Sequence, residues 1–148
     1  MEFNFSGTTV ELIQLSLAPV FLLVGIGQMV NVVTGRLARI IDRARWFEDL
    51  QEVSPEKITR RAENEIESLG RRMKFANWSI TFLTGAAVTV CVDVILLLAN
   101  GMMGMALDSS TLITFILSLI LLTGGLLAFF LEVSVATATL KIAPRKGN

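Results

Sequence analysis

Two acidic residues, Asp93 and Glu132, lie in stretches of the sequence that otherwise carry no charge. A carboxylate within an apolar segment is costly, and such groups usually face a cavity, a basic partner or a route for ions. Asp93 is the stronger candidate for an ion route. For Glu132 two interpretations are open: a place on such a route, or an ion pair with Arg36 or Arg39.

Small and polar side chains recur at helical spacing in the same apolar stretches. In the third stretch they follow a seven-residue repeat, and in the second they follow steps of four residues up to Asp93. The candidates for a polar path are Asp93, Thr89, Thr81, Thr111, Thr114, Ser118, Gly125, Glu132, Gln28 and Asn31. Such residues can let helices pack closely and hydrogen-bond to one another, or they can line a path filled with water.

The composition argues against catalysis and against a metal centre. The chain contains no His and a single Cys, Cys91, so it lacks the commonest general base and the commonest transition-metal ligand. No nucleophile–base pair, phosphate-binding loop or cluster of metal ligands is recognisable in the sequence. We therefore expect no enzymatic activity, no metal and no cofactor.

Long apolar segments must position these residues. The chain has 148 residues, of which 53% are hydrophobic, and three of its runs are uncharged or hold one acid. A helix needs about 20 apolar residues to cross a bilayer. We predict an all-α integral membrane protein with three spans, the first within 1–35, the second over 75–99 and the third over 111–140.

Basic residues occur in two places, and their distribution predicts the orientation. Ten of the 13 lie between Arg36 and Lys74, and the other three lie within 141–148. Cytoplasmic segments of membrane proteins are enriched in Lys and Arg. We therefore expect the N-terminus and a loop over 100–110 outside the cell, and both 36–74 and the tail 141–148 in the cytoplasm. Because topology suffices to explain the arginines, no nucleic-acid partner is expected.

Three of these arginines, Arg36, Arg39 and Arg43, follow one another at about one-turn steps just after the first span. This position places them at the level of the lipid headgroups. We expect them to bind anionic lipid or to form salt bridges there.

The segment 36–74 is predicted to form a helical hairpin. Apolar residues recur at three- and four-residue steps on both sides of Ser54 and Pro55. A serine followed by a proline is typical of a helix start, because serine caps the helix and proline suits its first position. We predict that the first two spans continue out of the membrane as an antiparallel pair of helices, each of roughly 45 residues.

The stretch LAPVFLLVGIGQMVNVVTGRLARIIDRAR, from Leu17 to Arg45, resembles a bacterial membrane family catalogued as domain of unknown function 2721. The resemblance includes Asn31 and the three arginines at 36, 39 and 43, and the plan of a long hairpin between the first two spans is similar over most of the chain. It implies a bacterial inner-membrane protein and indicates no activity.

Two functions remain open from the sequence. The first is a homo-oligomeric channel or pore, permeable to cations, in which a ring of four or more copies turns a polar seam toward its axis. The alternative is a non-conducting membrane scaffold whose cytoplasmic hairpin recruits a partner protein. Both functions require membrane lipid as the surroundings of the protein.

Overall fold

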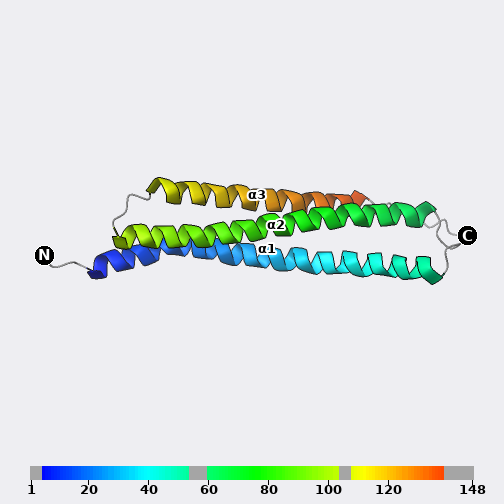
Figure 1. The fold of residues 1–148 in the computed structure, drawn as a ribbon, viewed down its shortest axis with the longest axis horizontal. Coiled ribbons are helices and arrows are strands. Elements are labelled where there is room, and N and C mark those ends of the chain that lie inside the picture. The colour runs from blue at the N-terminus through cyan, green and yellow to red at the C-terminus, as the bar shows by residue number, and fades with distance from the viewer. Residues whose placement is uncertain (1–4, 54–59, 104–107, 139–148) are drawn as a thin grey trace, which may run out of the picture.

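The computed structural model describes residues 5–53, 60–103 and 108–138, which form three α-helices. Helix α1 spans Phe5–Val53 (49 residues), α2 spans Arg60–Met103 (44 residues) and α3 spans Asp108–Ala138 (31 residues). The helices run side by side in an elongated bundle, with α1 and α2 extending beyond α3 at one end (Figure 1). The predicted turn at Ser54 and Pro55 and the tail 141–148 lie outside the described residues.

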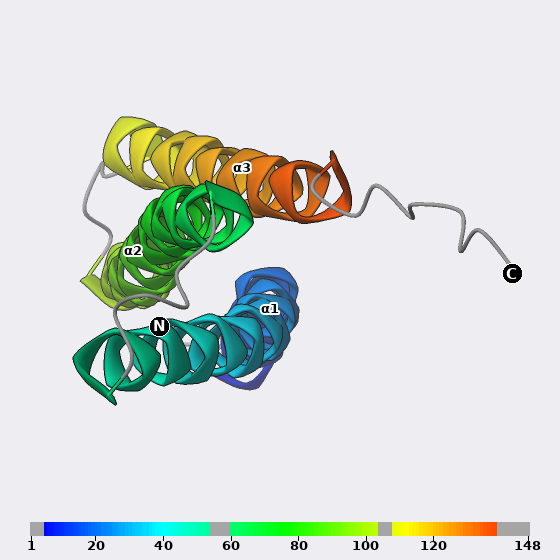
Figure 2. The ribbon, with the colours of Figure 1, turned by 90° about the vertical axis from the view of Figure 1, so that its right-hand side faces the viewer.

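Helix α2 is the central helix of the bundle. It packs against both α1 and α3, whereas α1 and α3 have few contacts with each other. Viewed from the end at which α1 ends and α2 begins, α1 and α3 lie on different sides of α2, and α1 crosses α2 obliquely (Figure 2).

The α1–α2 interface follows a seven-residue repeat on both helices. Buried residues of this repeat are Ile26, Val33, Ile40 and Phe47 on α1 and Leu69, Ala76, Leu83 and Val90 on α2. A repeat of seven is slightly out of step with a straight α-helix, so helices that keep it pack along their length by winding around one another. This repeat explains how two helices of more than 40 residues stay in contact.

A second repeat on α2 faces α3. Ser79 and Asp93 are both buried, are separated by two heptads and contact α3 through their side chains. Helix α2 therefore has two buried faces, and many large apolar side chains of α1 and α3, such as Phe21 and Phe130, are exposed on the outside of the bundle.

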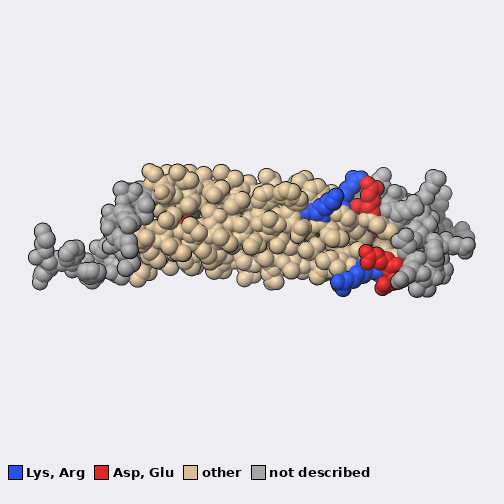
Figure 3. Space-filling model, in the orientation of Figure 1, with Lys and Arg blue, Asp and Glu red and all other residues tan. Residues whose placement is uncertain are grey.

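Three segments are long and apolar enough to cross a membrane: Ile13–Leu50, Glu65–Gly101 and Ser109–Thr137. An uncharged surface covers most of the length of the described bundle, and basic and acidic side chains gather near one end (Figure 3). We call this the basic end and the opposite end, where α1 begins, the N-terminal end. The prediction of an all-helical chain with three candidate membrane spans is confirmed.

Candidate functional site

Glu132 of α3 is the residue at which side chains of all three helices meet. Its Oε2 accepts a hydrogen bond from Nε of Arg36 on α1 at 2.9 Å, and its Oε1 accepts one from Nε of Arg72 on α2 at 3.0 Å. Nη2 of Arg72 also lies 3.0 Å from Oε1. The carboxylate thereby joins α1 to α3, although these two helices have few other contacts.

The charges of this cluster do not balance. The Glu132 side chain is 1% exposed, while those of Arg36 and Arg72 are 34% and 23% exposed. The Arg36 guanidinium also lies over the ring of Phe129, 5.7 Å from its centroid, a favourable position for a cation. One buried carboxylate thus serves two partly exposed cations, and the cluster carries a surplus positive charge.

Arg36 was one of two partners suggested for Glu132 by the sequence, and the other, Arg39, is exposed. Arg72 was not named at that stage. A signal for it exists: Arg72 closely precedes the second apolar run, as Arg36 closely follows the first, so both approach the same end of the bundle as Glu132. Counting helical rise from the span ends would have placed all three at one depth.

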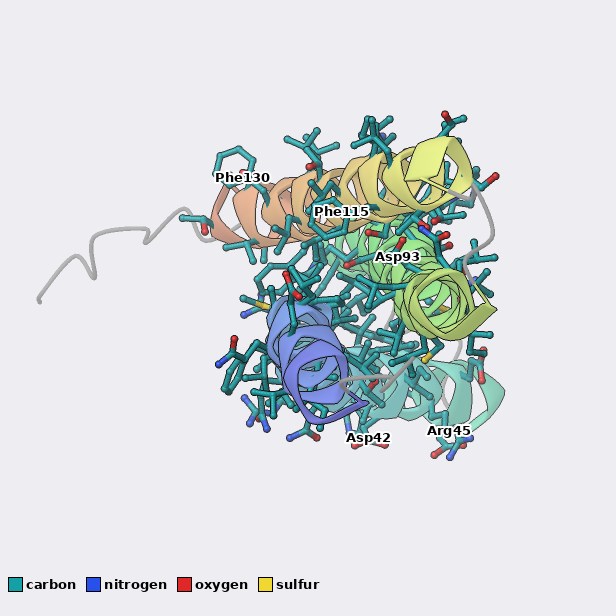
Figure 4. All side chains as sticks on the ribbon, turned by 90° about the vertical axis from the view of Figure 1, so that its left-hand side faces the viewer. Asp42, Arg45, Asp93, Phe115 and Phe130 are labelled. Carbon is teal, nitrogen blue, oxygen red and sulfur yellow. The ribbon has the colours of Figure 1, made fainter. Side chains whose placement is uncertain are left out.

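Asp93 is the second buried acid and lies near the N-terminal end. It is 2% exposed, and its Oδ1 accepts a hydrogen bond of 2.8 Å from the hydroxyl of Thr114 on α3. That hydroxyl also lies 3.1 Å from the Ser110 carbonyl and 3.0 Å from the Thr111 carbonyl. Because a hydroxyl has one proton to donate, Asp93 shares it with the backbone of α3. Figure 4 shows Asp93 between α2 and α3, seen from the N-terminal end.

The seven-residue seam of α3 lies against α2 within a single chain. Ser118 is fully buried and donates to the Phe115 carbonyl of its own helix at 2.7 Å. The carbonyl of Gly125 accepts a buried hydrogen bond of 2.8 Å from the Ser79 hydroxyl of α2. A Cβ placed on Gly125 would lie 2.8 Å from Cγ of Leu83, so glycine is needed for this close approach.

Thr81 and Thr89, the two threonines of the predicted path on α2, have partners within their own helix. Thr81 donates to the Asn77 carbonyl at 2.9 Å, and Thr89 donates to the Gly85 carbonyl at 2.8 Å. Thr81 is exposed and Thr89 is half-buried. Bonds of this kind satisfy a hydroxyl inside an apolar segment without a second helix.

Helix α1 presents polar and small residues on surface that neither α2 nor α3 covers. Gln28 and Asn31 are exposed, and neither side chain makes a hydrogen bond to another described residue. Cβ atoms placed on Gly25, Gly27 and Gly35 would meet no atom within 4 Å. The structure therefore separates two sets of sequence-predicted path residues: Ser118 and Gly125 of α3 are buried, whereas Gln28 and Asn31 of α1 are exposed.

Arg43 lies farther toward the basic end and joins α1 to α2. Its Nε lies 3.0 Å from Oε1 of Glu65, and its guanidinium lies over the rings of Trp46 and Phe47, at 4.5 and 4.8 Å. Both charged side chains are more than two-fifths exposed. This contact is an exposed counterpart to the buried cluster around Glu132.

Within the described residues, no group of three or more His, Cys, Asp or Glu side chains is arranged to hold a metal ion. The chemistry available to the described bundle comes from two buried carboxylates. One is held by two arginines at the basic end. The other is held by a hydroxyl at the N-terminal end.

Comparison with known proteins gives one match. No curated protein and no solved structure matches the chain significantly. A family model described as "protein of unknown function (DUF2721)" matches residues 16–142, a stretch that includes most of α1 and all of α2 and α3. The chain belongs to this family of proteins of unknown function.

Proposed function

We propose that the protein is a homo-oligomeric pore of the bacterial inner membrane, permeable to cations, with α1 facing the path. In this arrangement the N-terminal end faces outward and the hairpin of α1 and α2 lies in the cytoplasm. The orientation is supported by the ten basic residues between Arg36 and Lys74, because basic segments remain in the cytoplasm.

The observation that carries the proposal is the uncovered polar face of α1. Gln28 and Asn31 are exposed in the single chain, and both lie inside the apolar segment Ile13–Leu50. An amide that faces hydrocarbon without a partner is costly. A second copy of the chain, or water along the axis of a ring, would supply the missing hydrogen bonds. The open space beside Gly25 and Gly35 allows another helix to approach closely.

The α3 seam is a weaker candidate for the wall of the path. Ser118 and Gly125 are buried against α2, so water would reach them only if α2 and α3 separated. We therefore place the path along α1, which can face an axis while the three-helix packing stays intact. We propose a ring of four or more copies, since one or two copies cannot enclose a path with one helix each.

Selectivity for cations is supported by the charges at the N-terminal end. Glu11 is exposed near the start of α1, and no Lys or Arg occurs before Arg36. Repeated around a ring, Glu11 would form an acidic entrance, which favours cations. Arg36 at the other end is held by Glu132 on α3.

The test measures copy number and flux on the same preparations. Wild-type protein should appear as a ring of at least four subunits by native mass spectrometry from mild detergent, and it should conduct K⁺ in vesicles. The double variant Gln28→Leu, Asn31→Leu should lose most of the flux. The matched control, Leu127→Ile, alters an exposed apolar side chain of α3 and should conduct as wild type. A monomer, or full flux through the double variant in intact rings, would refute the proposal.

A scaffold is the second candidate and rests on a different part of the chain. At the basic end α1 and α2 continue past α3 (Figure 1), and Trp46 there is 48% exposed. Asp42 and Arg45 point away from the other helices (Figure 4). A large aromatic side chain among outward charges is typical of a surface that binds another protein. If Trp46→Ala abolishes capture of a cytoplasmic protein and wild-type vesicles do not conduct, the scaffold replaces the pore.

A further inference from the structure

A groove near the N-terminal end is formed by all three helices. Its volume is about 460 Å³, within the range of sites that hold small organic ligands. Leu15 and Pro19 of α1, Leu97 of α2 and Phe115 of α3 give it a largely apolar wall, and Asp93 of α2 lies in the same wall. In Figure 4, Phe115 points from α3 toward the other two helices, on the same side as Asp93.

The charge of Asp93 lacks the compensation that the other buried acid has. Glu132 and Asp93 are similarly buried, at 1% and 2% exposure, and Asp93 borders the groove. Glu132 is bound by two arginines, whereas Asp93 accepts a hydrogen bond from the uncharged hydroxyl of Thr114. No Lys or Arg occurs before Arg36 or between Lys74 and Lys141, so no basic side chain of the three helices originates near Asp93.

We propose that the groove binds an amphiphile that carries an ammonium group, with the ammonium at Asp93 and the hydrocarbon part along Leu15, Leu97 and Phe115. A cation satisfies the carboxylate, and an alkyl chain suits a wall made mostly of apolar side chains. A hydrated divalent metal ion fits less well, because Ca²⁺ takes six or more oxygen ligands and Asp93 is the one acid among the described residues of this wall.

The ammonium group could belong to a membrane aminophospholipid or to a free long-chain amine. The recognition chemistry is the same for both, and the groove lies within a single chain. The inference therefore does not rest on the proposed pore, and it can be tested in a monomer as well as in a ring.

The experiment measures retention of defined amphiphiles by native mass spectrometry of the full chain in mild detergent. The probes are dodecylammonium, dodecanol and dodecanoate, which share the alkyl chain and differ in charge. Wild-type protein should retain dodecylammonium at least about tenfold better than dodecanol, and dodecanoate least. Equal retention of the ammonium and the alcohol would overturn the proposal, since the carboxylate would then contribute nothing.

Two variants separate the carboxylate from the shape of the groove. Asp93→Asn keeps the size of the side chain and an acceptor for Thr114, and it should remove the preference for the ammonium. Ala18→Phe should fill the groove, of which Ala18 is part, and should reduce retention of all three probes. Glu67→Gln, an exposed acid near the basic end, is the matched control and should behave as wild type. Circular dichroism of each variant verifies that it is folded. An unchanged preference in folded Asp93→Asn would refute the assignment.

A second arm identifies the source of the ammonium group. The wild-type chain is placed in nanodiscs that contain equal amounts of phosphatidylethanolamine and phosphatidylglycerol. The protein is then released from the nanodisc in the mass spectrometer, and the lipid that stays bound to it is identified by its mass. Retention of phosphatidylethanolamine in wild type but not in Asp93→Asn would assign the groove to a membrane aminolipid. Retention of dodecylammonium without any lipid preference would assign it to a free amine. No preference for any ammonium compound in either arm would overturn the proposal.

Discussion

Replacing Glu132 by Gln should remove the charge that holds the three helices together at the basic end. The variant keeps the size of the side chain and one acceptor oxygen. That oxygen can still serve one of Arg36 and Arg72, but the new amide N–H faces the other guanidinium, and two donors cannot bond. The remaining bond also weakens, because its acceptor is no longer charged.

The expected loss of stability in Glu132→Gln can be worked out from the hydrogen bonds that Glu132 makes. A hydrogen bond to a charged group contributes about 1.5–3 kcal/mol, and Glu132 makes one such bond to each arginine. Arg36 and Arg72 are 34% and 23% exposed, so water partly replaces what each loses. We expect the free energy of unfolding to fall by about 2–4 kcal/mol, less than the sum of two full bonds.

The assay is titration with sodium dodecyl sulfate in mixed micelles, followed by the fluorescence of Trp46 and Trp78. Glu65→Gln is the matched control, since Glu65 also accepts from an arginine, Arg43, but at 44% exposure. An exposed pair contributes about 0–1 kcal/mol, so this control should shift the midpoint little. If the free energy of unfolding of Glu132→Gln lies within about 0.5 kcal/mol of that of the control, the cluster around Glu132 does not contribute significantly to stability, which would refute the prediction.

Two further substitutions test the α2–α3 interface by the same titration. Gly125→Ala should lower the free energy of unfolding by about 1–3 kcal/mol, because its Cβ would lie 2.8 Å from a side-chain atom of Leu83 on α2. Gly124→Ala should be nearly neutral, because its Cβ would make an ordinary contact of 3.7 Å with Phe82. Equal effects of the two substitutions would contradict this account of the packing. Thr114→Val should lower stability by about 1–3 kcal/mol because Asp93 loses a donor. Thr123→Val is its control, since the Thr123 hydroxyl donates to a carbonyl of its own helix. If Thr114→Val is as stable as this control, the hydrogen bond between Thr114 and Asp93 does not contribute to stability.

The three helices were predictable from the sequence because apolar runs of membrane-spanning length are strong signals. Their arrangement was not predictable by the same means. In a water-soluble helix an apolar stripe marks the core, but lipid is as apolar as the core, so both faces of these helices are apolar. Phe21 on the outside of α1 and Ile26 in its core give the same hydropathic signal. That α2 is central could not be read from hydropathy.

Small and polar residues indicated the packing faces of the helices better than apolar residues did, yet they did not indicate which helix each face would contact. The α3 seam that contains Ser118 and Gly125 could have faced water or a helix, and in the structure it lies against α2. Gln28 and Asn31 carry the same kind of signal on α1 and remain exposed. Small-residue spacing indicates close packing, while the identity of the packing partner depends on the complete bundle.

The two buried acids differ in whether they have a basic partner, and this difference is predictable from the sequence. Glu132 closely follows an apolar run at the end where basic residues gather, and it finds two arginines. Asp93 lies in the part of the chain that contains no Lys or Arg at all, so none of its neighbours within the bundle can neutralise it. A charge that its own chain compensates serves to hold helices together. A charge that its own chain leaves without a basic partner, beside a groove of about 460 Å³, supports the proposed binding of a cation from outside. For this reason we attribute stability to the cluster at the basic end and propose ligand binding at the N-terminal end.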